Sequence, residues 1–189
     1  MATALLTIDV QQALYSGVGE VFEAARQIAN INLAAAKARD ARVPVVVIQR
    51  ETDEGAIVYG SPGRQLADRL GVEPSDIRIR KCAPDSFHRT ELKEMSDQHN
   101  SGRFVNCGLQ SEFCVDTTTR RALALGYPVV LVADSHSTAD ICVLSAQQIS
   151  AHHNETLSNI TSFGPGVTLV PARELQIEAG HGVAPAGSD

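Results

Sequence analysis

The chain has 189 residues, with 16 basic and 22 acidic side chains and a net charge of −6. This length fits roughly one domain. The acidic net charge of the chain and its lack of Trp argue against nucleic-acid binding. No apolar run approaches the roughly 18 residues that cross a bilayer, and the first residues lack the basic flank of a secretion signal. We therefore expect a cytoplasmic protein with no nucleic-acid or membrane partner, a single domain over residues 1–179 and a flexible tail over residues 180–189.

Strand-like and helix-like segments alternate along the chain. The expected strands cover residues 3–8, 43–48, 77–81, 104–107, 127–133 and 167–170, and the expected helices cover residues 21–39, 61–70, 112–125 and 143–157. The run from Val43 to Ile48 is continuously apolar, which is typical of parallel strands covered on both faces. This order predicts an α/β protein with one mostly parallel sheet of about six strands and helices on both faces.

In such sheets, ligands bind beyond the carboxyl ends of the strands. The residues that follow the apolar runs are therefore the candidates for a site. They are Asp9, Gln49 and Arg50, Lys81, residues 108–114 and residues 134–137.

Several common motifs are absent from the sequence. Gly17 and Gly19 are followed by Phe22 where a dinucleotide fingerprint needs glycine, and the chain contains neither a GxxxxGK[ST] phosphate loop nor a GxSxG elbow. The four cysteines form no CxxC pair, which argues against a zinc site. We expect no cofactor and no metal.

Cys114 lies where a helix should begin after a strand and a glycine turn. Unpaired N–H groups and the helix dipole at that position stabilise a thiolate and can hold an oxyanion, although a cysteine in this context can also be an inert packing residue. Asp9 and Lys81 end two other strands, and each alone fits a turn or an edge residue. If the three side chains meet, Lys81 should lower the pKa of the thiol, so that the sulfur is anionic at rest.

Five segments resemble the isochorismatase-like cysteine hydrolases, a family that includes nicotinamidases, N-carbamoylsarcosine amidase and streptothricin hydrolase. They are LLTIDVQ at residues 5–11, IRK at 79–81, residues 86–92, GLQSEFCVDTT at 108–118 and residues 124–134. The resemblance implies a Rossmann-like three-layer α/β/α fold and a catalytic triad of Asp9, Lys81 and Cys114. It also implies a cis peptide bond between Leu109 and Gln110, with an oxyanion hole formed by the N–H groups of Gln110 and Cys114.

The resemblance has one informative departure. Nicotinamidases carry an Asp-x-His…His metal site after the second strand, whereas residues 49–60 (QRETDEGAIVYG) contain no histidine. A metal-dependent nicotinamidase is therefore disfavoured, and the triad points to hydrolysis of a C–N bond in a small amide, lactam or carbamoyl compound through a thioester. Family members are commonly homo-oligomers, so we expect one here.

Substrate contacts are less well defined by the sequence. Tyr15, Gln49, Phe113 and His136 follow strand ends or flank Cys114, so each could line the pocket or simply pack. Three other functions stay open: a vinyl-ether hydrolase that does not need Cys114, a non-catalytic binding protein with an ordinary thiol, and a redox protein that uses Cys107 with Cys114.

Overall fold

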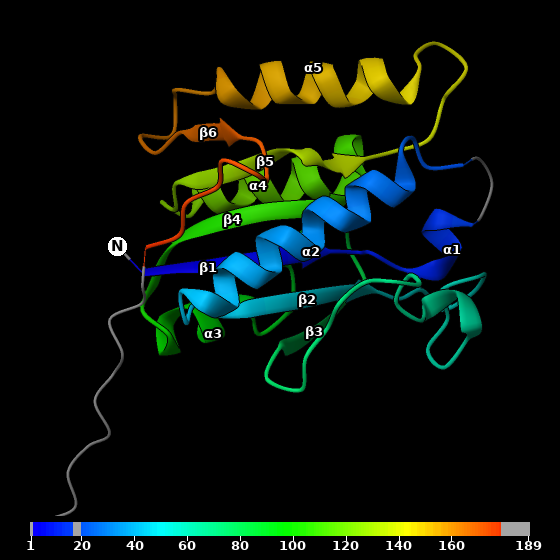
Figure 1. The fold of residues 1–189 in the computed structure, drawn as a ribbon, viewed down its shortest axis with the longest axis horizontal. Helices are drawn as coiled ribbons and strands as arrows, with labels where there is room; N and C mark the ends of the chain where they lie inside the picture. Colours follow the sequence, from blue (N-terminus) through cyan, green and yellow to red (C-terminus); the bar gives the residue numbers. More distant parts are fainter. Residues whose placement is uncertain (1, 17–19, 179–189) are drawn as a thin grey trace, which may run out of the picture.

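The computed structural model describes residues 2–16 and 20–178 (Figure 1). In chain order the elements are β1 (Ala2–Ile8), α1 (Gln12–Tyr15), α2 (Ala24–Asp40), β2 (Val45–Arg50), η1 (Pro62–Arg64), β3 (Ile77–Lys81), α3 (Leu92–Gln98), β4 (Ser101–Leu109), η2 (Ser111–Val115), α4 (Asp116–Ala124), β5 (Val129–Ser137), α5 (Ala146–Ser158) and β6 (Val167–Val170).

The six strands form one parallel sheet in the order β3-β2-β1-β4-β5-β6. The connections lead outward from β1 in both directions, so the strand order reverses between β1 and β4. A crevice opens at the carboxyl ends of a sheet where the order reverses in this way, and this is where α/β proteins bind ligands. The expected parallel sheet of six strands is confirmed.

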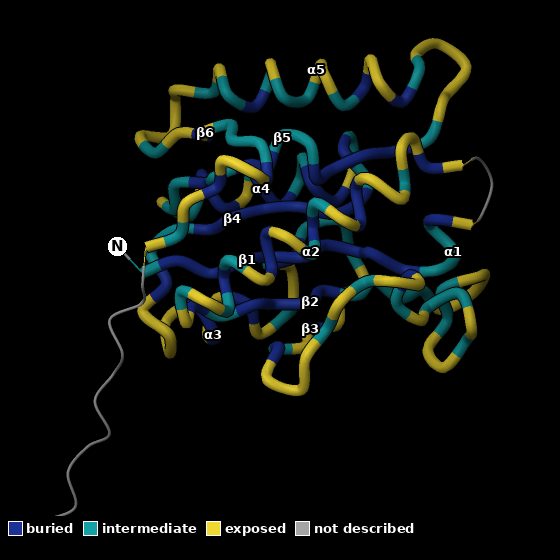
Figure 2. The backbone as a smooth tube through the Cα atoms, viewed as in Figure 1, coloured by how far each residue is buried: buried dark blue, intermediate teal, exposed yellow. Residues whose placement is uncertain are grey.

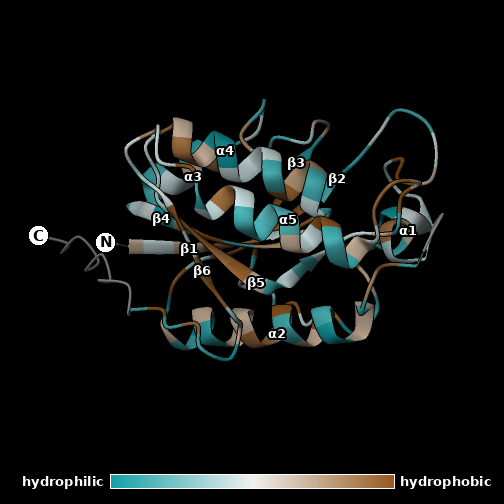
Figure 3. Ribbon diagram, turned by 90° about the horizontal axis from the view of Figure 1, so that it is seen from above, coloured by the Kyte–Doolittle hydropathy of each residue, from teal (hydrophilic) through white to brown (hydrophobic). Residues whose placement is uncertain are grey.

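Helices cover both faces of the sheet, as Figure 3 shows with the sheet seen nearly edge-on. Alternate strand residues point to opposite faces: Leu5 and Val47 pack toward α2, whereas Leu6 and Ile48 pack toward α3, α4 and α5. Most strand residues are buried (Figure 2), because a parallel sheet between two helical layers exposes neither face. The three-layer α/β/α arrangement is thereby confirmed.

One expected helix is wrong. The segment expected as a helix from Ser61 to Leu70 contains only the 3-10 turn η1, and Gln65 is already extended at φ −60° and ψ 156°. The backbone of residues 65–67 pairs with residues 10–12 instead: Gln12 donates to the Gln65 carbonyl at 2.8 Å, and Ala67 donates to the Val10 carbonyl at 3.0 Å. These long-range bonds tie the loop before β3 to the segment that follows β1.

The remaining differences concern boundaries and short helices. β4 and β5 are each longer than expected, and the short helices α1 and α3 were not expected at all. Gly126 ends the helical segment as expected, at a left-handed φ of 91°. The tail expected at residues 180–189 lies outside the described residues. Within residues 2–16 and 20–178, no helix is long and apolar enough to cross a bilayer.

Candidate active site

Asp9 and Lys81 meet at the carboxyl ends of their strands. Lys81 is the last residue of β3, and Asp9 directly follows β1 with a left-handed φ of 52°. The Nζ of Lys81 lies 2.9 Å from Oδ2 of Asp9, and both side chains are fully buried. Lys81 also donates to the Pro84 carbonyl at 2.9 Å. A buried ion pair needs close geometry to offset desolvation, so this contact fixes both side chains.

Cys114 lies in the helical turn η2 directly after β4, and its side chain is almost completely buried. Asp9 and Lys81 both lie close enough to the thiol to change its pKa. The Asp9 carboxylate raises the pKa of Cys114, and the Lys81 ammonium lowers it. The carboxylate of Asp9 makes no hydrogen bond of good geometry within the described residues. The structure therefore brings all three residues of the expected triad into one crevice.

The expectation that Cys114 is a thiolate at rest is wrong. Burial and the Asp9 carboxylate raise the pKa of Cys114 to about 12, and the opposing effect of Lys81 is smaller. Burial also raises the pKa of Asp9 above its ordinary value, against the charge of Lys81. The lysine charge is balanced mainly by Asp9, so the resting thiol is neutral. Asp9 is in turn a stronger base than a solvated carboxylate.

The turn that carries Cys114 is built around Gly108 and Gln110. The peptide bond between Leu109 and Gln110 is cis. Gly108 has a φ of 121°, and a Cβ there would lie 2.0 Å from the Ile8 carbonyl oxygen, so only glycine lets β4 approach β1 this closely. The Gln110 carbonyl accepts from the N–H groups of Phe113 and Val115, at 3.1 and 3.2 Å. These bonds hold the chain around the candidate oxyanion hole.

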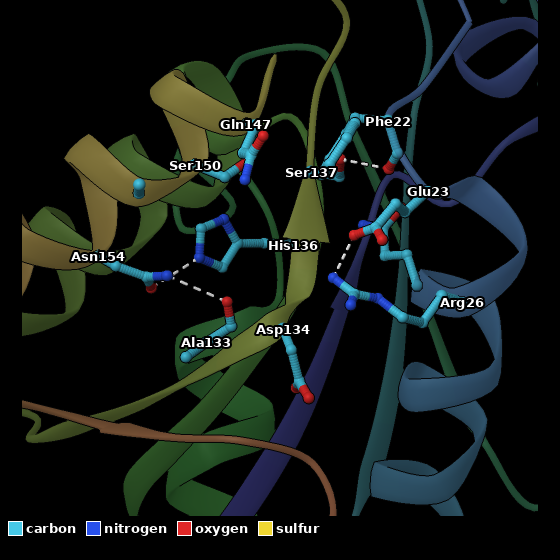
Figure 4. Close-up of a pocket in the computed structure, with 12 residues that line it drawn as sticks. Phe22, Glu23, Arg26, Ala133, Asp134, His136, Ser137, Gln147, Ser150 and Asn154 are labelled. Atoms are coloured by element: carbon cyan, nitrogen blue, oxygen red, sulfur yellow. Dashed lines mark hydrogen bonds and ion pairs between the residues drawn. The ribbon is translucent and has the colours of Figure 1, made fainter. Parts of the chain in front are cut away.

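The His136 imidazole is held between Ser111, the first residue of η2, and Asn154 of α5; Figure 4 shows the contact with Asn154. Asn154 donates its amide N–H to the Ala133 carbonyl at 3.0 Å, so its oxygen faces Nε2 of His136 at 2.9 Å. Nε2 therefore carries the proton, and Nδ1 accepts from the Ser111 hydroxyl at 2.8 Å. Burial lowers the pKa of His136 and keeps the ring neutral. The sequence gives no sign of the Ser111 and Asn154 contacts.

The other three expected pocket residues differ in their surroundings. Tyr15 donates to Oε1 of the buried Gln27 at 2.7 Å, and Gln27 donates to the Gly108 carbonyl at 2.9 Å, so this tyrosine braces the end of β4. Gln49 is half-buried and donates to the Arg64 carbonyl at 3.0 Å. Phe113, by contrast, is 52% exposed beside Cys114. The geometry thus favours a packing role for Tyr15 and leaves Phe113 free to contact a ligand.

The loop after β2 is held by contacts that the sequence does not reveal. Glu51 pairs with Arg64 at 3.0 Å and with Arg80 at 2.6 Å, and the two guanidinium groups lie over the Tyr59 ring at 5.1 and 4.3 Å. The fully buried Gln11 accepts from the N–H of Arg50 at 2.8 Å and donates to its carbonyl at 2.9 Å. The loop beside Lys81 is therefore well fixed.

One cavity adjoins Lys81, and a second lies against β5. The first, of about 270 Å³, is lined by Lys81, by Cys82 and by residues of the two adjoining loops. The other, of about 250 Å³, lies between α2, β5 and α5 and is lined by His136, Ser150 and Asn154 among others (Figure 4). In the part of the chain that the structure describes, no three His, Cys, Asp or Glu side chains gather as a metal site would require.

Cys107 is not placed to act with Cys114. Cys107 packs in the apolar cluster that faces α2, and its thiol donates to the Leu6 carbonyl at 3.3 Å. Cys114 packs in the cluster on the opposite face, toward α4. All four cysteines are free, with Cys82 and Cys142 exposed. This arrangement gives no support to a dithiol redox pair.

Residues 3–163 match the isochorismatase domain family. The chain belongs to the isochorismatase domain family. Its structure superposes on a crystal structure of an isochorismatase family protein with a TM-score of 0.81 and 31% identity, covering 89% of this chain and 97% of that one. The protein is therefore a member of the isochorismatase-like hydrolases.

Relatives with stated activities include amidohydrolases. A streptothricin hydrolase from Streptomyces noursei is 39% identical over 139 residues, which are 73% of this chain and 50% of that enzyme. A ureidoacrylate amidohydrolase from Pseudomonas syringae is 27% identical over 171 residues, covering 70% of this chain and 69% of that one. The chain thus spans about half the length of the streptothricin hydrolase it matches.

Proposed function

We propose that this protein is a cysteine-dependent hydrolase that cleaves a C–N bond in a small amide, lactam or carbamoyl compound. The observation that carries the proposal is the buried Lys81–Asp9 ion pair beside the Cys114 thiol, at the carboxyl ends of the central strands. The amidohydrolases among the relatives support the choice of a C–N bond. A nucleophile, a base and a fixed charge in one crevice are the parts that acyl transfer needs.

In the proposed reaction, Asp9 accepts the thiol proton as the sulfur of Cys114 attacks the carbonyl carbon. The N–H groups of Gln110 and Cys114 stabilise the oxyanion, an effect worth about 3–4 kcal/mol per donor in other acyl-transfer enzymes. Asp9 then protonates the leaving amine as the C–N bond breaks. Water, deprotonated by Asp9, hydrolyses the thioester and returns the thiol.

The raised pKa values suit this sequence of steps. A neutral thiol with a pKa of about 12 needs a base, and burial raises the pKa of Asp9 so that it accepts the proton more readily. The Lys81 ammonium group, 2.9 Å from Oδ2 of Asp9, stabilises the thiolate as it forms. We therefore expect kcat/KM to fall on the acid side at a pH above 3.8, the ordinary value for the Asp9 carboxyl group.

The test is turnover of a panel of small amides, lactams and carbamoyl compounds, followed as ammonia or amine release. Cys114→Ala should abolish turnover, whereas the matched variant Cys107→Ala removes another buried thiol and should retain it. Full activity of Cys114→Ala would reject the proposed nucleophile and favour an Asp9-dependent reaction such as vinyl-ether hydrolysis.

We also propose that the chain forms a homo-oligomer. Ile141, Val143 and Leu144 expose apolar side chains in the loop that leads to α5, and Val143 is 80% exposed. Such neighbouring apolar side chains favour association between copies. Light scattering during gel filtration should give a multiple of the chain mass, and Val143→Ser should reduce it. A monomer at all concentrations would contradict this expectation.

A further inference from the structure

Arg50 stands on the same face of the sheet as the triad. It is the last residue of β2, and its register partner on β3 is Lys81, so the two side chains point to the same side. Ile48, two residues earlier, packs in the apolar cluster that also contains Cys114. The charge of Arg50 also acts on Asp9, where it helps to lower the pKa of the carboxyl group. Arg50 therefore lies beside Lys81 on the face of the sheet that carries the triad.

The guanidinium of Arg50 lacks a partner within the described residues. Its Nε is buried and makes no hydrogen bond to residues 2–16 or 20–178, and no carboxylate oxygen of those residues lies within 4.0 Å of the group. Five other arginines also lack a carboxylate partner among the described residues. Arg42, Arg69, Arg78 and Arg89 are exposed to solvent, and the half-buried Arg103 donates from Nε to Oγ1 of Thr3 at 3.1 Å. Arg50 is also half-buried but, unlike Arg103, makes no hydrogen bond through its Nε to any described residue.

The backbone of Arg50 is held in place although its side chain is unpaired. The Gln11 side chain binds both the N–H and the carbonyl of Arg50. A partly buried cation without a counter-ion is costly, and Asp9 is already paired with Lys81, so the crevice retains one unbalanced positive charge. A planar guanidinium matches a carboxylate through two parallel hydrogen bonds.

We propose that Arg50 binds a carboxylate of the substrate, so that the preferred substrates are small amides or carbamoyl compounds that carry a carboxylate group. The ion pair would hold the anionic end of the substrate at the end of β2 while its amide carbonyl reaches Cys114. This inference rests on the proposed function, because it takes Cys114 as the reacting group. The inference specifies that the substrate of the proposed hydrolase carries a negative charge.

A matched pair of thiol reagents tests the inference without a known substrate. Iodoacetate carries a carboxylate group where iodoacetamide carries an uncharged amide group. Each reagent alkylates a thiol with loss of iodide. Peptide mapping gives separate rate constants for Cys114 and for the exposed Cys142, which serves as the internal reference. In the wild-type protein, the ratio of the iodoacetate to the iodoacetamide rate constant should be about 10-fold higher at Cys114 than at Cys142.

Variants assign the preference to one arginine. Arg50→Gln should bring the ratio at Cys114 to within about 2-fold of the ratio at Cys142, and Arg50→Lys should retain part of the preference. Arg78→Gln is the matched control, because that guanidinium is exposed on β3 and also has no carboxylate partner among the described residues, so its removal should leave the ratio high.

Three results would overturn the inference: equal ratios at Cys114 and Cys142, a ratio that Arg50→Gln does not change, or a Cys114 that neither reagent labels. The second result would make Arg50 only a counter-charge for Asp9. A high ratio that depends on Arg50, in a protein that hydrolyses no amide, would instead leave the anion site standing and reject the proposed function.

Discussion

Replacing Lys81 by methionine removes the cation from the buried pair and leaves the rest of the side chain nearly unchanged in volume. The Asp9 carboxylate then stays fully buried without the partner that lies 2.9 Å from it. Removing one member of a buried pair typically costs about 3–5 kcal/mol, because the remaining charge is uncompensated. At a typical dependence of about 2 kcal/mol per molar urea, the unfolding midpoint at pH 7 should fall by about 1.5–2.5 M.

The pH dependence separates this effect from lost packing. Without Lys81 the folded-state pKa of Asp9 rises further above its unfolded value, because the charge that opposed burial is gone. Between those two pKa values the folded variant binds a proton that the unfolded chain does not, so the stability of the variant increases as pH falls through that window. The loss relative to wild type should therefore be large at pH 7 and should shrink toward pH 5.

The assay is equilibrium urea unfolding of wild type and Lys81→Met at several pH values. Lys37→Met is the matched control, because Lys37 donates to the carbonyls of Ala172, Arg173 and Leu175 rather than to a carboxylate. Its loss should not depend on pH between 7 and 5. A loss below about 1 kcal/mol in Lys81→Met, or a loss equal at all pH values, would refute the reasoning about the buried pair.

Three further outcomes are expected. Gly108→Ala should lower the free energy of unfolding by more than about 4 kcal/mol or prevent folding. The added Cβ of Gly164→Ala meets nothing within 4 Å, so this variant should lose only about 1–2 kcal/mol, for its left-handed φ. Thermal unfolding of both variants measures the difference, and similar losses would contradict this prediction. Because burial lowers the pKa of His136, unfolding free energy should fall as pH drops below about 6.5, and His136→Gln should flatten that slope in urea titrations. Glu51→Gln removes the ion pairs with Arg64 and Arg80 and should loosen the loop after β2. The melting temperature should fall slightly, and KM should rise more than kcat changes. An unchanged KM would argue against a substrate role for that loop.

The sequence predicts the sheet well because the signal is local. Continuous apolar runs such as Val43–Ile48 predict buried parallel strands. The ends of the predicted strands point to Asp9 and Lys81, whose side chains lie 2.9 Å apart in the structure. The helix expected from Ser61 is absent, because its backbone pairs with residues 10–12, a contact between segments distant in sequence.

The electrostatic state of the site could not be predicted from composition or spacing. The side-chain types at positions 9, 81 and 114 suggest a lowered thiol pKa, but complete burial outweighs the lysine charge. Polar contacts between distant residues could not be predicted from the sequence either. The Gln11 side chain donates to the Arg50 carbonyl, and the Ser111 hydroxyl binds the His136 ring, across dozens of positions.

The most direct test of the account is the mass of the protein quenched in acid during turnover of an amide substrate. The account predicts a species heavier by the acyl group, with the added mass on the peptide that contains Cys114 and absent from Cys114→Ala. Rapid amide hydrolysis with no acyl adduct on Cys114, together with turnover by Cys114→Ala, would contradict it.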